Sequence, residues 1–182
     1  MKERPFRKER PFYFGRVDLV EQLREEACRR LEENRARIHA CAARLNDEQL
    51  WHRPNPHVVS VGNLILHLTG NIRQWINSTM GGEQDHRERD KEFDTVGPVH
   101  RVHVLAEMDM VLRHAIHVIR AIRDEDFERT WPVQGFHESG TAIVLHVVEH
   151  FSYHTGQITL HTKLLRDIDT GYYTGMDLNA KG

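Results

Sequence analysis

The sequence predicts an all-α protein, a single four-helix bundle. Four long segments repeat apolar residues at steps of three and four, which places those residues on one side of a helix. No segment shows the sustained apolar–polar alternation that is typical of a strand. The length of 182 residues, of which 39% are hydrophobic and 29% charged, suits one domain with a full core. Long helices without strands bury their apolar sides most simply in a bundle.

The first predicted helix covers about residues 18–45, with Asp18 as its N-cap. Asn34 interrupts an otherwise apolar series made of Val20, Leu23, Ala27, Leu31, Ile38, Cys41 and Leu45. The loop HRPNPH follows, because its prolines cannot continue a helix. We therefore divide the chain into an N-terminal arm (1–17), a metal-binding bundle domain (18–166) and a C-terminal tail (167–182).

The second predicted helix begins after Ser60, a favourable N-cap, and ends at Gly81-Gly82. Its apolar side consists of Val61, Leu64, Leu68, Ile72 and Trp75. The next segment, EQDHRERDKEFD at residues 83–94, is almost entirely charged, so we expect a solvated connection.

The third predicted helix begins near Pro98, a residue suited to a first helical turn, and ends near Ile122. It is expected to bury Val102, Leu105, Leu112, Ile116 and Ile119. The fourth covers about Thr141 to Leu165 and follows a loop with the sequence WPVQGFHESG. An aromatic tail closes the chain.

The composition is unusual in its 14 histidines, and their positions suggest two groups. On a helical projection of the third helix, His103, His114 and His117 lie roughly opposite the apolar residues and are expected to face water. We expect the same of the histidines at helix edges and in loops, which are His39, His52, His57, His86, His100 and His137.

The fourth helix contains LHVVEHFSYHTGQ, in which three histidines recur every four residues. On a helical projection they share an arc of about 80° with one further histidine; the four are His146, His150, His154 and His161. The apolar residues on this side are Ile143, Leu164 and Leu165, and the residues on the other side are Glu149, Ser152, Thr155, Thr159 and Lys163. The histidines therefore point inward, where an imidazole needs a partner.

Two of these histidines can be directed at one metal ion. His146 and His154 are separated by about 12 Å along a helix, too far for both to share an ion at bond lengths of ~2.1 Å. The pair is His146 with His150 or His150 with His154, and no glutamate lies between the latter two to make a zinc-protease motif. A third ligand must come from another helix, and His67, in the middle of the second helix, is the candidate.

SVGNLILHLTGNIRQWI, followed much later by HVVEHFSYHTGQI, resembles the DinB/YfiT-like family of metalloenzymes, and a branch of unknown function in particular. The resemblance extends over nearly the whole chain and implies a four-helix bundle with a metal site at His67, His150 and His154. His146 then becomes a neighbour of the site. Many members have H-R-G-Q at the last ligand, whereas this chain has Thr155 in place of the arginine.

Characterised relatives include transferases and isomerases that use low-molecular-weight thiols such as bacillithiol or mycothiol, and others are described as hydrolases. Three neutral histidines leave open positions on a divalent ion, for which zinc and nickel are the leading candidates. Such an ion can either hold a thiol as its thiolate or activate water. The resemblance favours the first and implies a thiol S-transferase acting on a small-molecule substrate. The alternatives are a hydrolase, disfavoured because Glu149 points away from the histidines, and a non-catalytic metal-binding interaction module.

Charge, hydropathy and cysteine content indicate which partners and which cellular compartment to expect. A net charge of −2 gives no support for nucleic-acid binding, and no apolar run reaches the ~18 residues of a membrane span. The basic N-terminus lacks the apolar core of a secretory signal. Cys28 and Cys41 are roughly 20 Å apart on one helix, too far for a disulfide, so we expect a cytoplasmic protein. We expect a homodimer to bury the aromatic residues outside the helices, which are Phe6, Phe12, Tyr13, Phe14, Tyr172 and Tyr173.

Overall fold

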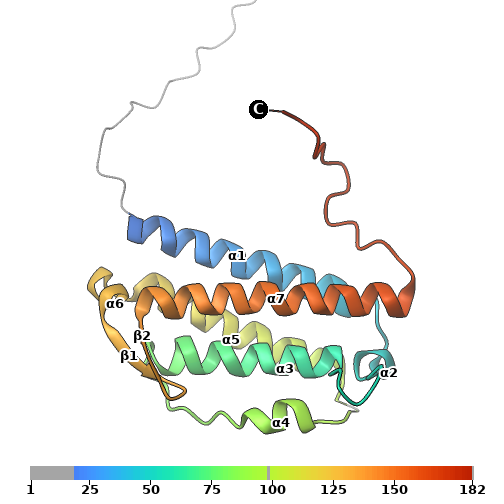
Figure 1. Cartoon of the computed structure of the whole chain (residues 1–182), viewed down its shortest axis with the longest axis horizontal. Helices are drawn as coiled ribbons and strands as arrows, with labels where there is room; N and C mark the ends of the chain where they lie inside the picture. The colour runs from blue at the N-terminus through green and yellow to red at the C-terminus, as the bar shows by residue number, and fades with distance from the viewer. Residues whose placement is uncertain (1–18, 98, 182) are drawn as a thin grey trace, which may run out of the picture.

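The computed structural model describes residues 19–97 and 99–181, so Asp18, Pro98 and the N-terminal arm lie outside it. The four predicted long helices are present as α1 (Leu19–Ala42), α3 (Val61–Ile72), α5 (Arg101–Ala121) and α7 (Gly140–Arg166). They form one bundle in which α7 packs against α1 and α3, and α5 packs against the same two helices from the other side (Figure 1). The fold is mostly helical, which confirms the predicted all-α bundle.

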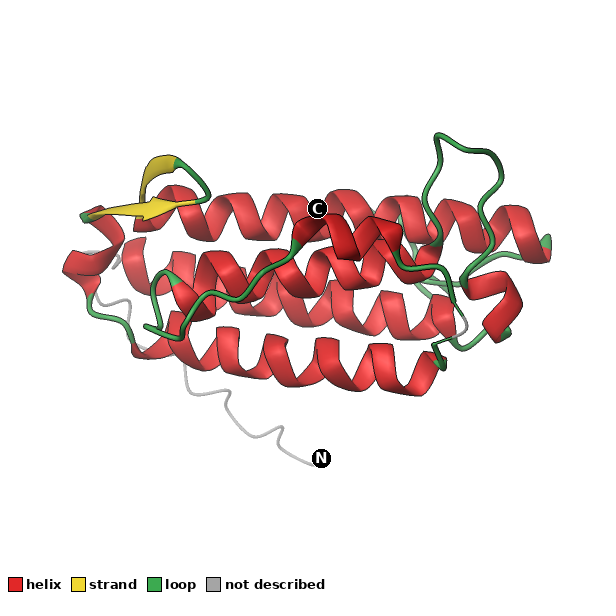
Figure 2. Ribbon diagram, turned by 90° about the horizontal axis from the view of Figure 1, so that it is seen from below, coloured by secondary structure: helices red, strands yellow, loops and turns green. Residues whose placement is uncertain are grey.

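The chain direction through the bundle determines what lies beside α3. Helices α1 and α7 run one way and α3 and α5 the other, so the connection from α3 to α5 must return along the outside of the bundle (Figure 1). This crossover contains a short helix, α4 (Arg89–Asp94), which packs on the outer side of α3 (Figure 2).

The prediction of a solvated connection at residues 83–94 was wrong for two side chains. Glu92 is only 8% exposed, and the Arg87 side chain is 4% exposed. The reason is that the two side chains form an ion pair with each other, and Glu92 also binds His67 on α3. A largely charged segment can therefore dock if its few inward side chains are paired.

The second helix is capped as predicted but changes character in its last turns. The Ser60 side chain accepts a hydrogen bond from the Asn63 backbone amide, and the Asn63 side-chain oxygen accepts one from the Ser60 backbone amide. After Ile72 the helix continues as a π-helix, η1 (Arg73–Ser78). A turn follows, and the chain leaves it at Gly82, whose φ of 76° suits glycine. π-helices are rare and are frequently found at functional sites.

Several short elements were not predicted, because each is too short to show a periodicity. They are the helices α2 (Asp47–Leu50) and α6 (Asp124–Glu128) and the strands β1 (Thr130–Val133) and β2 (Phe136–Ser139). The two strands form an antiparallel hairpin in the segment predicted as a loop. Gln134 and Gly135 make its turn, and both have positive φ.

Two predicted core residues are exposed, Val102 at 69% and Leu164 at 73%. The core side of α5 is instead centred on Val104, Met108, Val111, Leu112, Ala115, Val118 and Ile119. Thr155 differs in the opposite sense: it was placed on the polar side of α7, yet it is 2% exposed. Its hydroxyl donates to the backbone oxygen of Phe151 at 2.8 Å, so its burial leaves no hydroxyl hydrogen unpaired.

The tail residue Tyr172, which we expected a homodimer to bury, is anchored to its own chain, whereas Tyr173 is 51% exposed. Tyr172 packs against the core, and its hydroxyl lies 2.8 Å from Thr159 Oγ1 and 3.0 Å from Cys41 Sγ. Burial raises the pKa of Tyr172 to about 12. Cys28 and Cys41 are both buried free thiols. Among the residues that the structure describes, no helix is both long and apolar enough to cross a membrane.

Candidate metal centre

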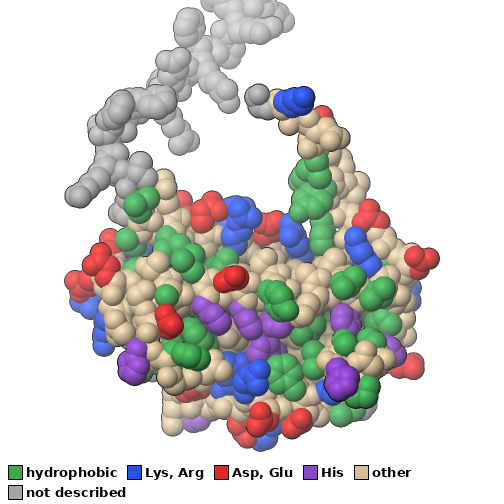
Figure 3. Space-filling view, viewed as in Figure 1, with side chains coloured by type: hydrophobic (Ala, Val, Ile, Leu, Met, Phe, Trp, Pro, Cys, Tyr) green, Lys and Arg blue, Asp and Glu red, His purple; other side chains and the backbone are tan. Residues whose placement is uncertain are grey.

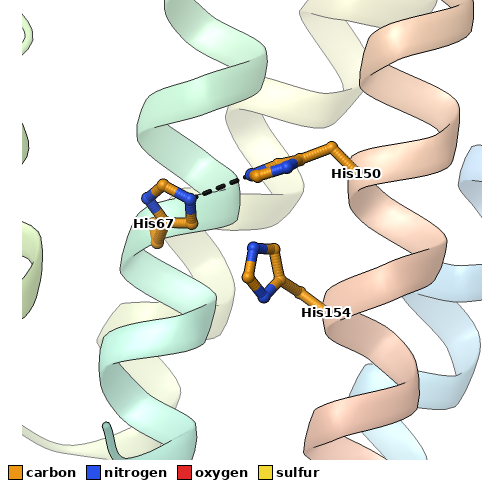
Figure 4. Close-up of side chains that lie close together, drawn as sticks. All are labelled: His67, His150 and His154. Carbon is orange, nitrogen blue, oxygen red and sulfur yellow. Dashed lines mark hydrogen bonds between the residues drawn. The ribbon is translucent and has the colours of Figure 1, made fainter. Parts of the chain in front are cut away.

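Helices α3 and α7 bring together the three histidines that the sequence singled out. His67 lies on α3 and is 5% exposed, whereas His150 and His154 are half-buried and one turn apart on α7 (Figure 4). One ring nitrogen from each lies within 4.8 Å of the others. Within residues 19–97 and 99–181 this is the one group of three or more His, Cys, Asp or Glu side chains placed to hold an ion.

Hydrogen bonds fix the tautomers of two of these histidines. His67 Nδ1 lies 2.8 Å from Glu92 Oε2, and a carboxylate only accepts, so this nitrogen carries the proton. His154 Nδ1 lies 2.6 Å from the amide oxygen of Gln157 and is protonated for the same reason. When either ring is neutral, its Nε2 is therefore the unprotonated nitrogen that can bind a metal, and it is directed away from these partners.

The third histidine completes the set of donors. His150 Nε2 lies 2.9 Å from His67 Nε2, so the two nitrogens point at one another (Figure 4). Nitrogens bound to one tetrahedral zinc are about 3.4 Å apart, given bonds of ~2.1 Å. The three side chains thus fit a divalent cation in chemistry and approximately in spacing, and they could hold one.

The buried ion pair behind His67 was not predicted. Arg87 Nε donates to Glu92 Oε1 at 2.7 Å and Arg87 Nη2 to Glu92 Oε2 at 3.0 Å, while Arg87 Nη1 donates to Gln74 Oε1 at 3.0 Å. Burial acts to raise the pKa of Glu92, but the hydrogen bonds from His67 and Arg87 and the Arg87 charge outweigh it and hold that pKa below its ordinary value. Glu92 is therefore an ionised acceptor for His67 at neutral pH.

Two residues of α3 allow α4 to approach so closely. Asn63 is fully buried, and its Nδ2 donates to the backbone oxygens of Glu92 and Thr95, both at 2.9 Å. A Cβ at Gly70 would lie 1.9 Å from Glu92 Oε1, so only glycine fits at this position without moving the carboxylate. The spacing of charged residues in the segment 83–94 does not distinguish Glu92 or Arg87 from the others. The capping pattern at Ser60 does not predict that Asn63 also binds the backbone of Glu92 and Thr95.

His146 is a neighbour of the three histidines and not part of their group. Its ring stacks on Trp75 with centroids 3.8 Å apart and faces the His150 ring at 5.4 Å and 18°. Asn71 Nδ2 lies 3.4 Å from its Nε2. Trp75 is held in turn by a hydrogen bond of 3.0 Å from its Nε1 to Gln134 Oε1 in the hairpin turn. His146 therefore supports the ring of His150 from one side.

The remaining histidines behave largely as predicted. His103 and His117 are exposed, and His114 is partly exposed and pairs with Glu83 at 2.6 Å. The histidines of α7, by contrast, lie where the surface meets the interior. Figure 3 shows histidine side chains gathered in the middle of the face of the molecule where α7 meets α3, so part of this group reaches the surface.

Acid is expected to destabilise the metal-free protein. Burial, together with the neighbouring His154 and His67, lowers the pKa of His150 from 6.5 to about 3, and burial also lowers the pKa values of His146 and His154. Unfolded histidines bind protons near ~6.5 and these folded ones do not, so stability is present above that pH and falls as the pH decreases from there toward about 3.

Urea unfolding of chelator-treated protein at pH 7.5 and 5.0 measures this effect. The free energy of unfolding should be lower at pH 5.0, and metal-loaded protein should release its ion over the same range. A variant at an exposed histidine, His117→Gln, should show the same pH dependence as the wild type. Equal stability at the two pH values would contradict the assignment of buried neutral imidazoles.

This helical bundle has the fold of DinB-like proteins. Similar solved structures are a DinB-like protein from Bacillus cereus (17% identity, 80% of this chain, 92% of that chain, TM-score 0.64) and a conserved protein from Enterococcus faecalis (12%, 79%, 97%, TM-score 0.66). A third is a DinB-like protein, YjoA, from Bacillus subtilis (13%, 77%, 91%, TM-score 0.59). At these identities the likeness concerns the fold alone.

Residues 18–174 match the family described as "Protein of unknown function (DUF1572)". Because the match spans most of the chain, the protein belongs to the DUF1572 family. No curated protein matches the sequence. The resemblance to DinB/YfiT-like proteins and the predicted fold are both confirmed.

Proposed function

We propose that the protein binds one divalent metal ion, zinc or nickel, through His67, His150 and His154, and that it is a metal-dependent thiol S-transferase. The observation that supports the metal site best is the pair of fixed tautomers, with Glu92 and Gln157 each accepting the Nδ1 proton of one histidine. A bound divalent ion would lower the pKa of a coordinated thiol and hold it as the thiolate nucleophile. Sulfur would then bond to the electrophilic carbon of a second substrate as its leaving group departs.

The residues of the chain would orient the site and admit the substrate. His67 is held rigidly by the buried Glu92–Arg87 pair, whereas His150 and His154 lie at the partly exposed side. A small thiol can therefore approach from the α7 side without rearrangement of the core. Trp75 and His146 form the adjacent wall and limit the site in the direction of the hairpin.

A hydrolase is the second candidate, and the surrounding carboxylates do not favour it. Activating water at a metal ion commonly involves a carboxylate base nearby. Glu149 is exposed on α7, and Glu92 is engaged by His67 and Arg87 through both of its oxygens. Neither is placed as a free base, so we prefer the transferase. A non-catalytic metal-binding module remains the third alternative.

Metal content tests the first part of the proposal. Untagged protein is expected to contain about one divalent ion per chain after incubation with zinc or nickel and removal of excess metal, as measured by elemental analysis. A substoichiometric content after such loading would contradict the site.

Thiol binding tests the second part. In cobalt-substituted protein, cysteine or glutathione should produce a sulfur-to-cobalt charge-transfer band, and a thioether such as methionine should not. Absence of the band with every thiol, in protein that holds its cobalt, would refute the transferase and leave the other two alternatives to be separated by ester and amide hydrolysis assays.

A further inference from the structure

The outer face of α7 carries apolar side chains that no part of residues 19–97 and 99–181 covers. Leu145 is 52% exposed, Tyr153 64%, Leu160 57% and Leu164 73%. On a helical projection they share an arc of about 100°, directly beside the histidines. Figure 3 shows hydrophobic side chains next to the histidines on this face. Single exposed apolar residues are ordinary, but four aligned along one helix indicate a contact surface.

Gly156 lies near the middle of α7 on this face, and no contact among the described residues requires a glycine there. Glycine is less favourable than alanine in the interior of a helix, yet a Cβ at Gly156 would meet nothing within 4 Å. On the projection Gly156 points about 160° away from His154, so it does not face the metal centre either. A glycine here would allow a second helix to approach α7 closely.

Charges on the same face are arranged symmetrically about this glycine. Glu149 precedes it by seven residues and Lys163 follows it by seven. If two α7 helices packed antiparallel with their glycines at the centre, Glu149 of each would oppose Lys163 of the other. Glu149 is exposed, and Lys163 lies only at the limit of an ion pair, 3.8 Å from Asp169. A self-complementary patch of this kind is the property of a two-fold interface.

We propose that the outer face of α7 is a homodimer interface, in which two copies of α7 pack antiparallel about Gly156. Tyr172 was expected to contribute to a homodimer interface, but it packs against its own core. The outer face of α7 takes its place as the proposed interface. The interface would adjoin the metal centre through Tyr153, whose ring contacts His154 with centroids 5.0 Å apart and whose hydroxyl lies 3.4 Å from Gln157 Nε2. Burial of Tyr153 would therefore also restrain the amide that orients His154.

The oligomeric state of the full chain tests the surface. Light scattering at micromolar concentration should give twice the chain mass of 21.4 kDa. Leu160→Glu should give the monomer mass, because it buries two carboxylates in the interface. The matched control is Met110→Glu on α5, an equally exposed apolar residue at 55%, which should remain dimeric. A monomeric wild type, or a dimer that Leu160→Glu leaves intact, would overturn the proposal.

A charge exchange tests the antiparallel arrangement. Glu149→Lys and Lys163→Glu should each weaken dimerisation by at least roughly tenfold at low salt, because each places like charges opposite one another. The double variant, Glu149→Lys with Lys163→Glu, should restore the dimer. Circular dichroism would verify that all three are folded. Dimers unaffected by the single changes, or not restored by the double change, would refute this pairing. The experiment requires no metal, so its outcome is independent of the proposed activity.

Discussion

His150→Ala protein is expected to lose tight metal binding altogether, and His67→Ala and His154→Ala are expected to do the same. Each change removes one of three nitrogen donors, and two remaining imidazoles on a partly exposed site compete poorly with water and buffer. Zinc or nickel affinity measured by competition with a chromophoric chelator checks all three variants.

His146→Ala provides the contrast. Its ring supports His150 from the side of Trp75 but is not placed among the three donors, so its loss should weaken binding by ~10- to 100-fold at most. His117→Ala, at an exposed histidine of α5, should bind metal as the wild type does. The assignment fails if His146→Ala empties the site while His154→Ala leaves it full.

The helices could be predicted because their signal is local. The buried residues of α1 from Ala27 to Cys41 repeat at steps of three and four. The Ser60 side chain caps α3 by accepting a hydrogen bond from the backbone amide of Asn63, three residues further on. Errors occur where one helix has two candidate sides. Val102 is compatible with the helical period of α5, but the packing of α3 and α1 selected the side of Val104 instead.

The ligands could be proposed for the same reason, since spacing by four aligns side chains along one helix. Spacing alone left His146 and His154 as alternatives; the choice required the motif that ends in Gly156-Gln157. The structure supplies a physical reason for that motif, because Gln157 accepts the Nδ1 proton of His154. Glu92 and Arg87 could not be predicted, because their burial depends on a crossover whose route the sequence pattern does not specify.

The threonine that replaces the arginine of related motifs lies away from the ligands. Thr155 is buried in the core side of α7, and its hydroxyl is bound within its own helix. Its neighbours His154 and Gln157 keep their mutual hydrogen bond. Thr155 therefore belongs to the core side of α7 and takes no part in the set of three donors.

Arg87→Met is expected to reduce the free energy of unfolding by about 3–5 kcal/mol at pH 7, the usual cost of removing one partner from a buried ion pair. Both side chains are buried, at 4% exposure for Arg87 and 9% for Glu92. Without the guanidinium, burial raises the pKa of Glu92, so the loss of stability should be smaller at pH 5 than at pH 7. Urea unfolding at the two pH values measures it.

A second substitution separates the charge of Glu92 from its role at His67. In Arg87→Met with Glu92→Gln, the neutral amide oxygen can still accept the His67 Nδ1 proton, and no unpaired charge remains. Most of the lost stability should return, while metal affinity should stay about 10- to 100-fold below the wild type, because the neutral acceptor makes His67 a weaker ligand. Lys91→Met, in an exposed pair with Glu88, should change neither quantity appreciably. If the double variant is as unstable as Arg87→Met alone, an unpaired carboxylate is not the cause; if it binds metal as tightly as the wild type, the ion pair does not tune the site.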